Sequence, residues 1–178
     1  GRRLTQDPKE LRSGGRPPTG MKNLALNDRA DILYVMSYRI HTVGTVRRDD
    51  TGAVLELDPA YLEALRGLDG FSHITIIYWF DRNDTPGKRQ TLLVHPRKDP
   101  GNPLTGVFAT RSPRRPNLLG MDTARLLSVE GNRVRIDRTD ALDGTPIIDL
   151  KPYIPVSDAF PEAAVPEWVP GTGDEDDG

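Results

Sequence analysis

Turn-forming residues cut this chain into short segments, and that spacing constrains the fold more than any other feature. Glycine and proline number 17 and 16 among 178 residues, and between them lie short β-branched, aromatic or alternating runs. The strongest run is FSHITIIYWF at residues 71–80, which predicts a strand buried on both faces. The pattern therefore favours an all-β domain.

Helix-capping residues and apolar runs predict the other elements of the domain. Asp58 and Pro59 suit the cap and first position of a short helix that runs to Leu65, and a second short helix is predicted over 24–36. Further strands are predicted at 38–46, 53–57, 90–94, 107–110, 117–129 and 133–137. Strands this short, with one brief helix in the core region, predict a small, mostly antiparallel β-barrel with flexible termini.

Composition divides the chain into three parts. We predict an accessory or disordered extension at 1–35, a barrel domain at 36–160 and a Pro-rich, acidic tail at 161–178. Residues 38–160 hold 17 Lys/Arg and 16 Asp/Glu, whereas the tail holds none and 6. Because the core is nearly neutral, any contact with RNA must use a local basic patch.

Several classes of function are disfavoured. The chain has no cysteine, which excludes disulfides and thiolate chemistry and fits a reducing cytoplasm. His41, His73 and His95 are far apart in sequence, so no metal site is predicted. No run approaches the roughly 20 apolar residues that span a bilayer, and the first residues lack a secretory signal, so no membrane association is expected.

Residues 106–120, GVFATRSPRRPNLLG, form the first segment with a chemical signature. Arg111, Arg114 and Arg115 lie within five positions, and Pro113 and Pro116 fix the backbone around them. A stiff loop with forked cations suits a carboxylate or phosphate ligand. A solvated loop that only connects strands would also fit this composition.

Residues 140–153, DALDGTPIIDLKPY, form the second such segment. Gly144 supplies a tight turn, and an aspartate or tyrosine in this run is suited to accept a proton. A simple β-turn with a salt bridge remains the alternative. The titratable residues of the run are Asp140, Asp143, Asp149, Lys151 and Tyr153.

Together the two segments and the 71–80 strand resemble the TrmO (TsaA-like) methyltransferase family, over most of residues 40–155. The family's runs are similar to GVFATRS..RPNPIG and D.LDGTP..DIKPY. The resemblance implies a single β-barrel that binds S-adenosylmethionine, acts as a homodimer in the cytoplasm, and methylates the exocyclic nitrogen of threonylcarbamoyl-adenosine beside the tRNA anticodon.

The resemblance also assigns roles to individual residues. Those implied for the cofactor are Asp81, Arg82, Arg111, Met121, Arg138, Thr139 and Asp140. Those implied for substrate are Arg115, Asn117 and Lys151. Candidates for the proton acceptor are Asp143, Asp149 and Tyr153, and the sequence does not choose among them.

One departure from the family keeps other functions open. Where family members carry a longer loop with a Gln-Pro-Gly-like element, this chain has only residues 47–50, RRDD, between two strands. The chain therefore resembles a shortened member. A methyltransferase for a small molecule, or a non-catalytic barrel that binds a ligand or RNA, are the alternatives.

Overall fold

The computed structural model describes residues 21–23 and 34–169, and the chain divides into two units, residues 1–40 and 41–178. In the first unit β1 (Met21–Asn23) pairs antiparallel with β2 (Tyr34–Met36). The helix predicted over 24–36 is thus wrong at its end, because residues 34–36 pair as a strand. The rest of that prediction, over 24–33, lies outside the described residues.

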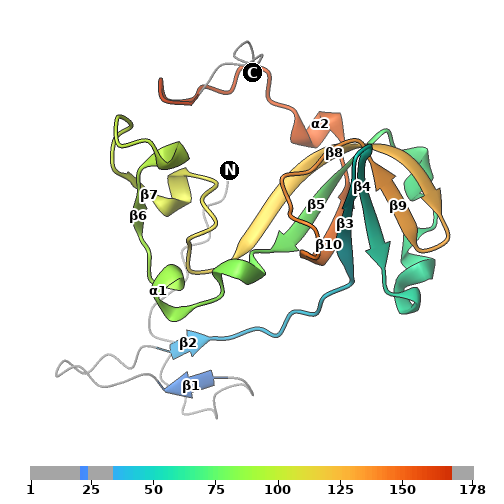
Figure 1. The fold of residues 1–178 in the computed structure, drawn as a ribbon, viewed down its shortest axis with the longest axis horizontal. Helices are drawn as coiled ribbons and strands as arrows, with labels where there is room; N and C mark the ends of the chain where they lie inside the picture. The colour runs from blue at the N-terminus through green and yellow to red at the C-terminus, as the bar shows by residue number, and fades with distance from the viewer. Residues whose placement is uncertain (1–20, 24–33, 170–178) are drawn as a thin grey trace, which may run out of the picture. The chain divides into compact units, whose positions relative to one another are not determined.

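The second unit is built on a closed six-stranded barrel, which confirms the predicted fold class. The strand order is β10-β3-β4-β9-β8-β5 and every neighbouring pair is antiparallel (Figure 1). The strands are β3 (Gly44–Asp49), β4 (Gly52–Leu57), β5 (His73–Trp79), β8 (Leu119–Glu130), β9 (Arg133–Ile136) and β10 (Pro146–Pro152).

Alternate residues of these strands fill the barrel. On β5, Ile74 and Ile76 are fully buried, while Ile77 between Ile76 and Tyr78 is only half-buried. The prediction that both faces of this strand are buried is therefore wrong: closing the barrel buries one face and leaves the other partly in solvent. The other fully buried core side chains are Val46, Leu55, Val134, Ile136 and Ile147.

Two strand predictions along the barrel need correction. The first strand begins at Gly44 rather than Tyr38, at the point where its backbone approaches β4 so closely that a Cβ on Gly44 would lie 2.4 Å from the carbonyl oxygen of Glu56. Strand β10 follows the Gly144 turn and was not predicted, because prolines begin and end it and two charges interrupt its apolar residues. It closes the barrel by pairing with both β3 and β5.

Short helices connect the strands. The predicted helix after Asp58 is η2 (Pro59–Leu65), and the Asp58 carboxylate accepts a hydrogen bond from the Ala60 amide at 2.9 Å. The other helical turns are η3 (Leu68–Gly70), η4 (Asp81–Asn83), α1 (Pro86–Arg89), η5 (Pro96–Lys98), η6 (Val107–Ala109) and α2 (Pro155–Asp158). No helix in the described part of the chain has the length and apolarity needed to cross a membrane.

A long excursion between β5 and β8, residues 84–118, is called the arm here. Its only ladder is β6 (Leu93–Val94) with β7 (Thr105–Gly106), visible in yellow-green in Figure 1. The strand predicted at 90–94 is therefore shorter than expected. The strand predicted at 107–110 is instead the turn η6, which the Thr110 amide closes onto the Val107 carbonyl at 3.3 Å.

Candidate functional site

The two sequence segments meet at one cavity of about 240 Å³, called the motif cavity here. Pro113 comes from the arginine-rich loop, and Asp140, Ala141, Leu142 and Thr145 come from the turn before β10. The remaining wall is the end of β5 with the turn that follows it: Tyr78, Phe80, Asp81, Arg82 and Asn83. Three segments that are distant in sequence thus form one site.

Backbone hydrogen bonds fix the 140–145 turn to strand β3. The Gly144 amide donates to the Val46 carbonyl, and the Val46 amide donates to the Thr145 carbonyl, each at 2.9 Å. Gly144 has φ of 82°, a left-handed conformation that glycine adopts without strain. These two hydrogen bonds and the glycine turn therefore fix the position of the 140–145 turn, which forms one wall of the cavity.

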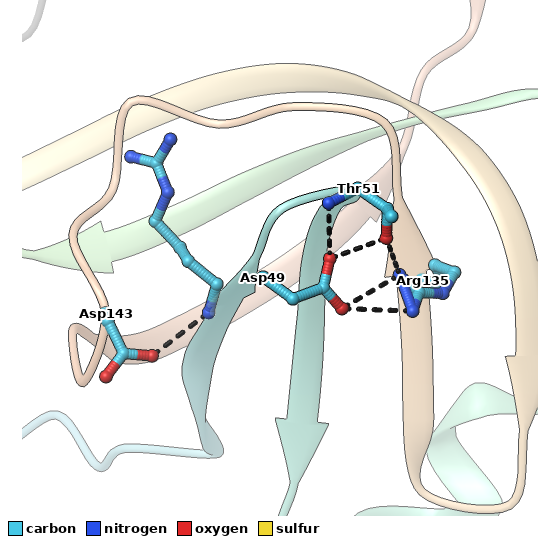
Figure 2. Close-up of polar contacts among 5 residues, drawn as sticks. Asp49, Thr51, Arg135 and Asp143 are labelled. Atoms are coloured by element: carbon cyan, nitrogen blue, oxygen red, sulfur yellow. Dashed lines mark hydrogen bonds and ion pairs between the residues drawn. The ribbon is translucent and has the colours of Figure 1, made fainter.

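Figure 2 shows how the β3–β4 hairpin supports that wall. The Asp143 carboxylate accepts a hydrogen bond from the Arg48 amide at 3.0 Å. In the same hairpin Asp49 accepts from the Thr51 amide and hydroxyl at 2.9 and 2.6 Å and pairs with Arg135 at 3.0 Å. These hydrogen bonds, with that from the Thr51 hydroxyl foremost, lower the pKa of Asp49. Asp143 thus ties the turn to a hairpin that is itself locked.

Arg82 connects the other wall to the same turn. Its guanidinium donates to the Asp143 carbonyl at 3.1 Å, while its own carbonyl accepts from the Lys88 ammonium at 2.7 Å. Arg82 therefore lines the cavity and also holds the turn that carries Asp140 against the segment after β5.

Tyr78 forms the inner wall and explains a glycine of the first segment. A Cβ on Gly120 would lie 2.2 Å from the Tyr78 ring, so only glycine fits at this point of β8. Burial, with the nearby carboxylates of Asp122 and Asp140, raises the pKa of Tyr78 to about 12, against a smaller lowering by Arg111. The phenol therefore stays protonated at neutral pH and is available as a hydrogen-bond donor.

Arg89 holds the arginine-rich loop and the start of the arm to β5. It pairs with Asp84 at 2.7 Å, donates to the Pro116 carbonyl at 3.1 Å and lies 5.3 Å from the Trp79 ring centre. The hydrogen bond from Arg89 lowers the pKa of Asp84, and the same bond raises the pKa of Arg89. Pro113 reaches the motif cavity from this anchored loop.

The residues implied for the cofactor occupy four different places in the structure. Asp81, Arg82 and Asp140 line the motif cavity, and Arg111 lines a larger groove beside it. Thr139 is buried behind the cavity wall, where its hydroxyl accepts from the Ala141 amide at 3.1 Å. Met121 and Arg138 are exposed and do not line either space.

The candidate proton acceptors and substrate residues do not line the motif cavity. Asp149 pairs with Lys151 at 2.8 Å along β10, and that hydrogen bond raises the pKa of Lys151. Tyr153 contacts His73 edge-on, with ring centres 6.3 Å apart. In the arginine-rich loop, Arg115 donates to the Thr110 carbonyl at 3.2 Å, and the exposed residue Asn117 accepts from the Leu119 amide at 2.8 Å through its carbonyl.

Sequence reasoning missed the aromatic wall of the cavity, which consists of Tyr78 and Phe80. Their rings meet edge-to-face with centres 5.5 Å apart. The only signal was their position at the end of the strongest predicted strand, immediately before Asp81. An aromatic residue there reads equally well as core, so the sequence could not assign it to the site.

The chemistry of the cavity fits S-adenosylmethionine. Arg82, with Arg111 close by, matches the ligand's carboxylate, and Asp81 and Asp140 match its ammonium group and ribose hydroxyls. Tyr78 and Phe80 supply an apolar, aromatic wall for the uncharged parts. Among the described residues no cluster of three or more histidine or acidic side chains is arranged to hold a metal ion.

The sequence matches a family model over a range that contains all six barrel strands. Residues 43–159 match the model for the tRNA-methyltransferase O N-terminal domain. A probable S-adenosyl-L-methionine-binding protein of Methanocaldococcus jannaschii is 43% identical over 114 residues, which cover 64% of this chain and 90% of that protein.

A bacterial enzyme and a solved structure are also similar. The tRNA (adenine(37)-N6)-methyltransferase of Escherichia coli is 40% identical over 106 residues, which cover 57% of this chain and 44% of that enzyme. The crystal structure of TrmO from Pseudomonas aeruginosa superimposes with a TM-score of 0.59 at 28% identity, covering 75% of this chain and 62% of that one. This chain thus spans less than two thirds of either protein.

Proposed function

The chain belongs to the family of the tRNA-methyltransferase O N-terminal domain, and from that premise we propose that it is an S-adenosylmethionine-dependent tRNA methyltransferase. The acceptor that we propose is the exocyclic nitrogen of threonylcarbamoyl-adenosine beside the tRNA anticodon. Because the proposed substrate is tRNA, we propose that the protein acts in the cytoplasm. The observation that carries the proposal is the motif cavity, where Pro113 of the first segment and Asp140 of the second line one space.

S-adenosylmethionine, when bound, supplies an electrophilic methyl group. The chain's own contribution is positioning. Arg82 and Asp140 line the same cavity, and the hydrogen bond from Arg82 to the Asp143 carbonyl fixes their spacing. Tyr78 keeps its phenol proton at neutral pH, since burial raises its pKa to about 12, and it can therefore serve as a hydrogen-bond donor but not as the proton acceptor.

An amide-like nitrogen must lose a proton as it is methylated, and the acceptor of that proton is a separate proposal. Asp143, Asp149 and Tyr153 remain candidates by resemblance, but the Asp143 carboxylate accepts from the Arg48 amide and Asp149 is paired with Lys151. Asp140 is the carboxylate of the second segment that lines the cavity, so we add it as the group to test first.

The functional unit that we propose is a homodimer. The resemblance implies it, and the size of the cavity supports it: about 240 Å³ is below the usual 300–1,000 Å³ of small-ligand sites. Met121, which is 53% exposed, and Arg138 are the exposed implied cofactor residues that line neither the motif cavity nor the groove beside it, and a second copy is expected to complete the site there.

The test combines the protein, labelled S-adenosylmethionine and tRNA that carries threonylcarbamoyl-adenosine. We expect label in the RNA, its loss in Asp140→Asn, and normal transfer in Glu63→Gln, which removes one exposed carboxylate from η2. Cofactor binding without transfer to tRNA would refute the proposed substrate and favour a small-molecule acceptor. Absence of cofactor binding by calorimetry would refute the methyltransferase itself.

A further inference from the structure

A groove of about 1230 Å³, called the arm groove here, lies between the arm and residues 168–169 of the C-terminal segment. It is larger than the 300–1,000 Å³ typical of sites for one small molecule. Pro113 lines both this groove and the motif cavity, so the two spaces share a boundary. A ligand that fills the groove therefore ends beside the proposed methyl-donor site.

The walls of the arm groove carry only positive charge. Arg97, Lys98, Arg111 and Arg114 line it, and no aspartate or glutamate is among its described lining residues. None of these four side chains forms an ion pair or hydrogen bond within the described part of the chain, although Arg89 of the same arm does. Four cations without counter-ions in a concave surface fit an extended anion.

Two of these cationic residues lie in a turn with left-handed backbone conformation. Arg97 and Lys98 are consecutive and both have left-handed φ, 57° and 61°, which costs a non-glycine residue about 1–2 kcal/mol. The turn is held from both sides: the His95 ring hydrogen-bonds the Asn102 backbone carbonyl at 2.8 Å, and the Asn102 side-chain amide Nδ2 donates to the Pro96 carbonyl at 3.0 Å. The fold thus keeps both side chains at the rim of the groove.

An exposed aromatic side chain, Phe108, lines the same groove. Phe108 is 80% exposed, and its neighbour Val107 is 2% exposed, with its amide bonded to the Leu92 carbonyl at 2.9 Å. Because η6 buries Val107, it directs Phe108 outward. An exposed ring in a groove that cations also line is the arrangement on which unstacked bases of single-stranded nucleic acid stack.

We propose that the arm groove binds single-stranded RNA next to the methyl acceptor, with phosphates on Arg97, Lys98 and Arg114 and a base stacked on Phe108. The shared boundary at Pro113 then presents the next nucleotide to the motif cavity. This inference rests on the proposed function and deepens it, because it assigns the surface that holds the substrate strand. Duplex RNA is not favoured, because its bases are stacked and cannot reach a lone ring.

The test measures binding of a fluorescent single-stranded RNA to the full chain by anisotropy, across salt concentrations and without transfer. For Arg97→Asn with Lys98→Asn, which tolerates the left-handed turn, we expect about tenfold weaker binding and a salt slope lower by about 1.4. For Phe108→Ala we expect a loss of about fivefold or more with the slope unchanged, and recovery in Phe108→Trp. The control Arg47→Gln with Arg66→Gln removes two barrel charges and is expected to bind normally.

Each other outcome has a distinct meaning. Groove variants that bind RNA like the unaltered chain overturn the proposal, even if methyl transfer to tRNA is observed. If a poly-glutamate peptide competes for the groove as well as RNA does, the ligand is an acidic polypeptide instead. If the groove variants dissociate a dimer in light scattering, the groove is an interface with a second copy of the chain. If the groove variants weaken RNA binding but the unaltered chain transfers no methyl group, the groove is supported as an RNA-binding surface and the proposed methyltransferase function is refuted. Calorimetry with S-adenosylmethionine is expected to be unchanged in every variant.

Discussion

The barrel wall and the arm groove differ in whether their cationic side chains are paired with carboxylates. On the barrel, Arg47 and Arg133 both pair with Glu56, and Arg135 pairs with Asp49. In the arm groove the four lining cations have no such partner within the described residues. Exposed ion pairs add little stability, so the pairing on the barrel matters chiefly because two carboxylates offset most of the charge of these three arginines. The arm instead keeps an open charge, as a binding surface requires.

The two regions also differ in their cores. The barrel encloses a continuous cluster of buried side chains, whereas the arm has a two-residue ladder and exposes Leu92, Leu93, Leu104 and Phe108. The barrel is therefore expected to set the stability of the protein, and the arm to contribute mainly to binding. Four experiments test this division, from the largest expected effect to the smallest.

The largest effect is expected for Ile76→Ala. Ile76 is fully buried, so the cavity left behind should lower the free energy of unfolding by about 2–5 kcal/mol. Urea unfolding followed by tryptophan fluorescence measures it, because Trp79 ends β5 and Trp168 lines the arm groove. The matched variant Leu93→Ala, at a side chain 56% exposed, should lose less than about 1 kcal/mol. Equal losses would contradict the division.

Gly120→Ala is expected to affect both stability and cofactor binding. The new Cβ would overlap the Tyr78 ring, which should cost about 1–3 kcal/mol and displace the inner wall of the motif cavity. Calorimetry with S-adenosylmethionine should show weaker binding. Gly106→Ala in the arm, where nothing lies within 4 Å of the added Cβ, is the control and should leave both quantities unchanged.

Arg89→Met removes one link between the two regions, the contact of the Arg89 guanidinium with the Trp79 ring of β5. Its pair with Asp84 is solvent-exposed, so only a small loss of stability is expected, with faster proteolysis of the arm. The pKa of Asp84 should rise towards its ordinary value, as measured by NMR titration. Because the folded-state pKa of Asp84 is lowered, its contribution is present above the ordinary carboxyl pKa and is lost as pH falls through the lowered value. Arg66→Met, which breaks an exposed pair on the barrel, should leave the arm's proteolysis unchanged.

The smallest effect is spectroscopic. Absorbance titration of the unaltered chain minus Tyr78→Phe should reveal one phenol with a pKa of about 12, and Tyr61→Phe should not remove it. Since the folded pKa exceeds the ordinary 10.0, this contribution to stability is complete below pH 10 and is lost as pH rises through 12. Arg111→Gln should raise the pKa of Tyr78 further, because the arm's guanidinium lowers it. No change would show that Arg111 is remote from the motif cavity.

Local signals predicted much of the barrel. The cap at Asp58, the turn at Gly144 and the alternation of 133–137 depend on neighbouring residues, and each appears at its expected place. The family resemblance is confirmed as well. The errors lie where a segment's structure depends on a distant partner: 107–110 is β-branched and aromatic, but its residues turn onto Leu92 instead of joining a sheet.

The candidate site was predictable only in part. Asp81, Arg82 and Asp140 were expected at one site through the resemblance, and they line one cavity. Tyr78 was not expected, because its side chain faces the site only once β5 is placed against β8. The roles of Asp143, Asp149 and Tyr153 stay predictions.

The sequence by itself determined the all-β class, the short helix after Asp58 and the family. Turn-forming residues, side-chain alternation and motifs indicate these properties, and each consists of residues that are contiguous in the chain. Only the tertiary structure decided how the barrel closes through β10, that Gly120 must admit the Tyr78 ring, and that Pro113 meets Asp140. The physical reason is that alternation fixes which side chains face inward but not which strands become neighbours. That choice depends on packing between residues far apart in the chain.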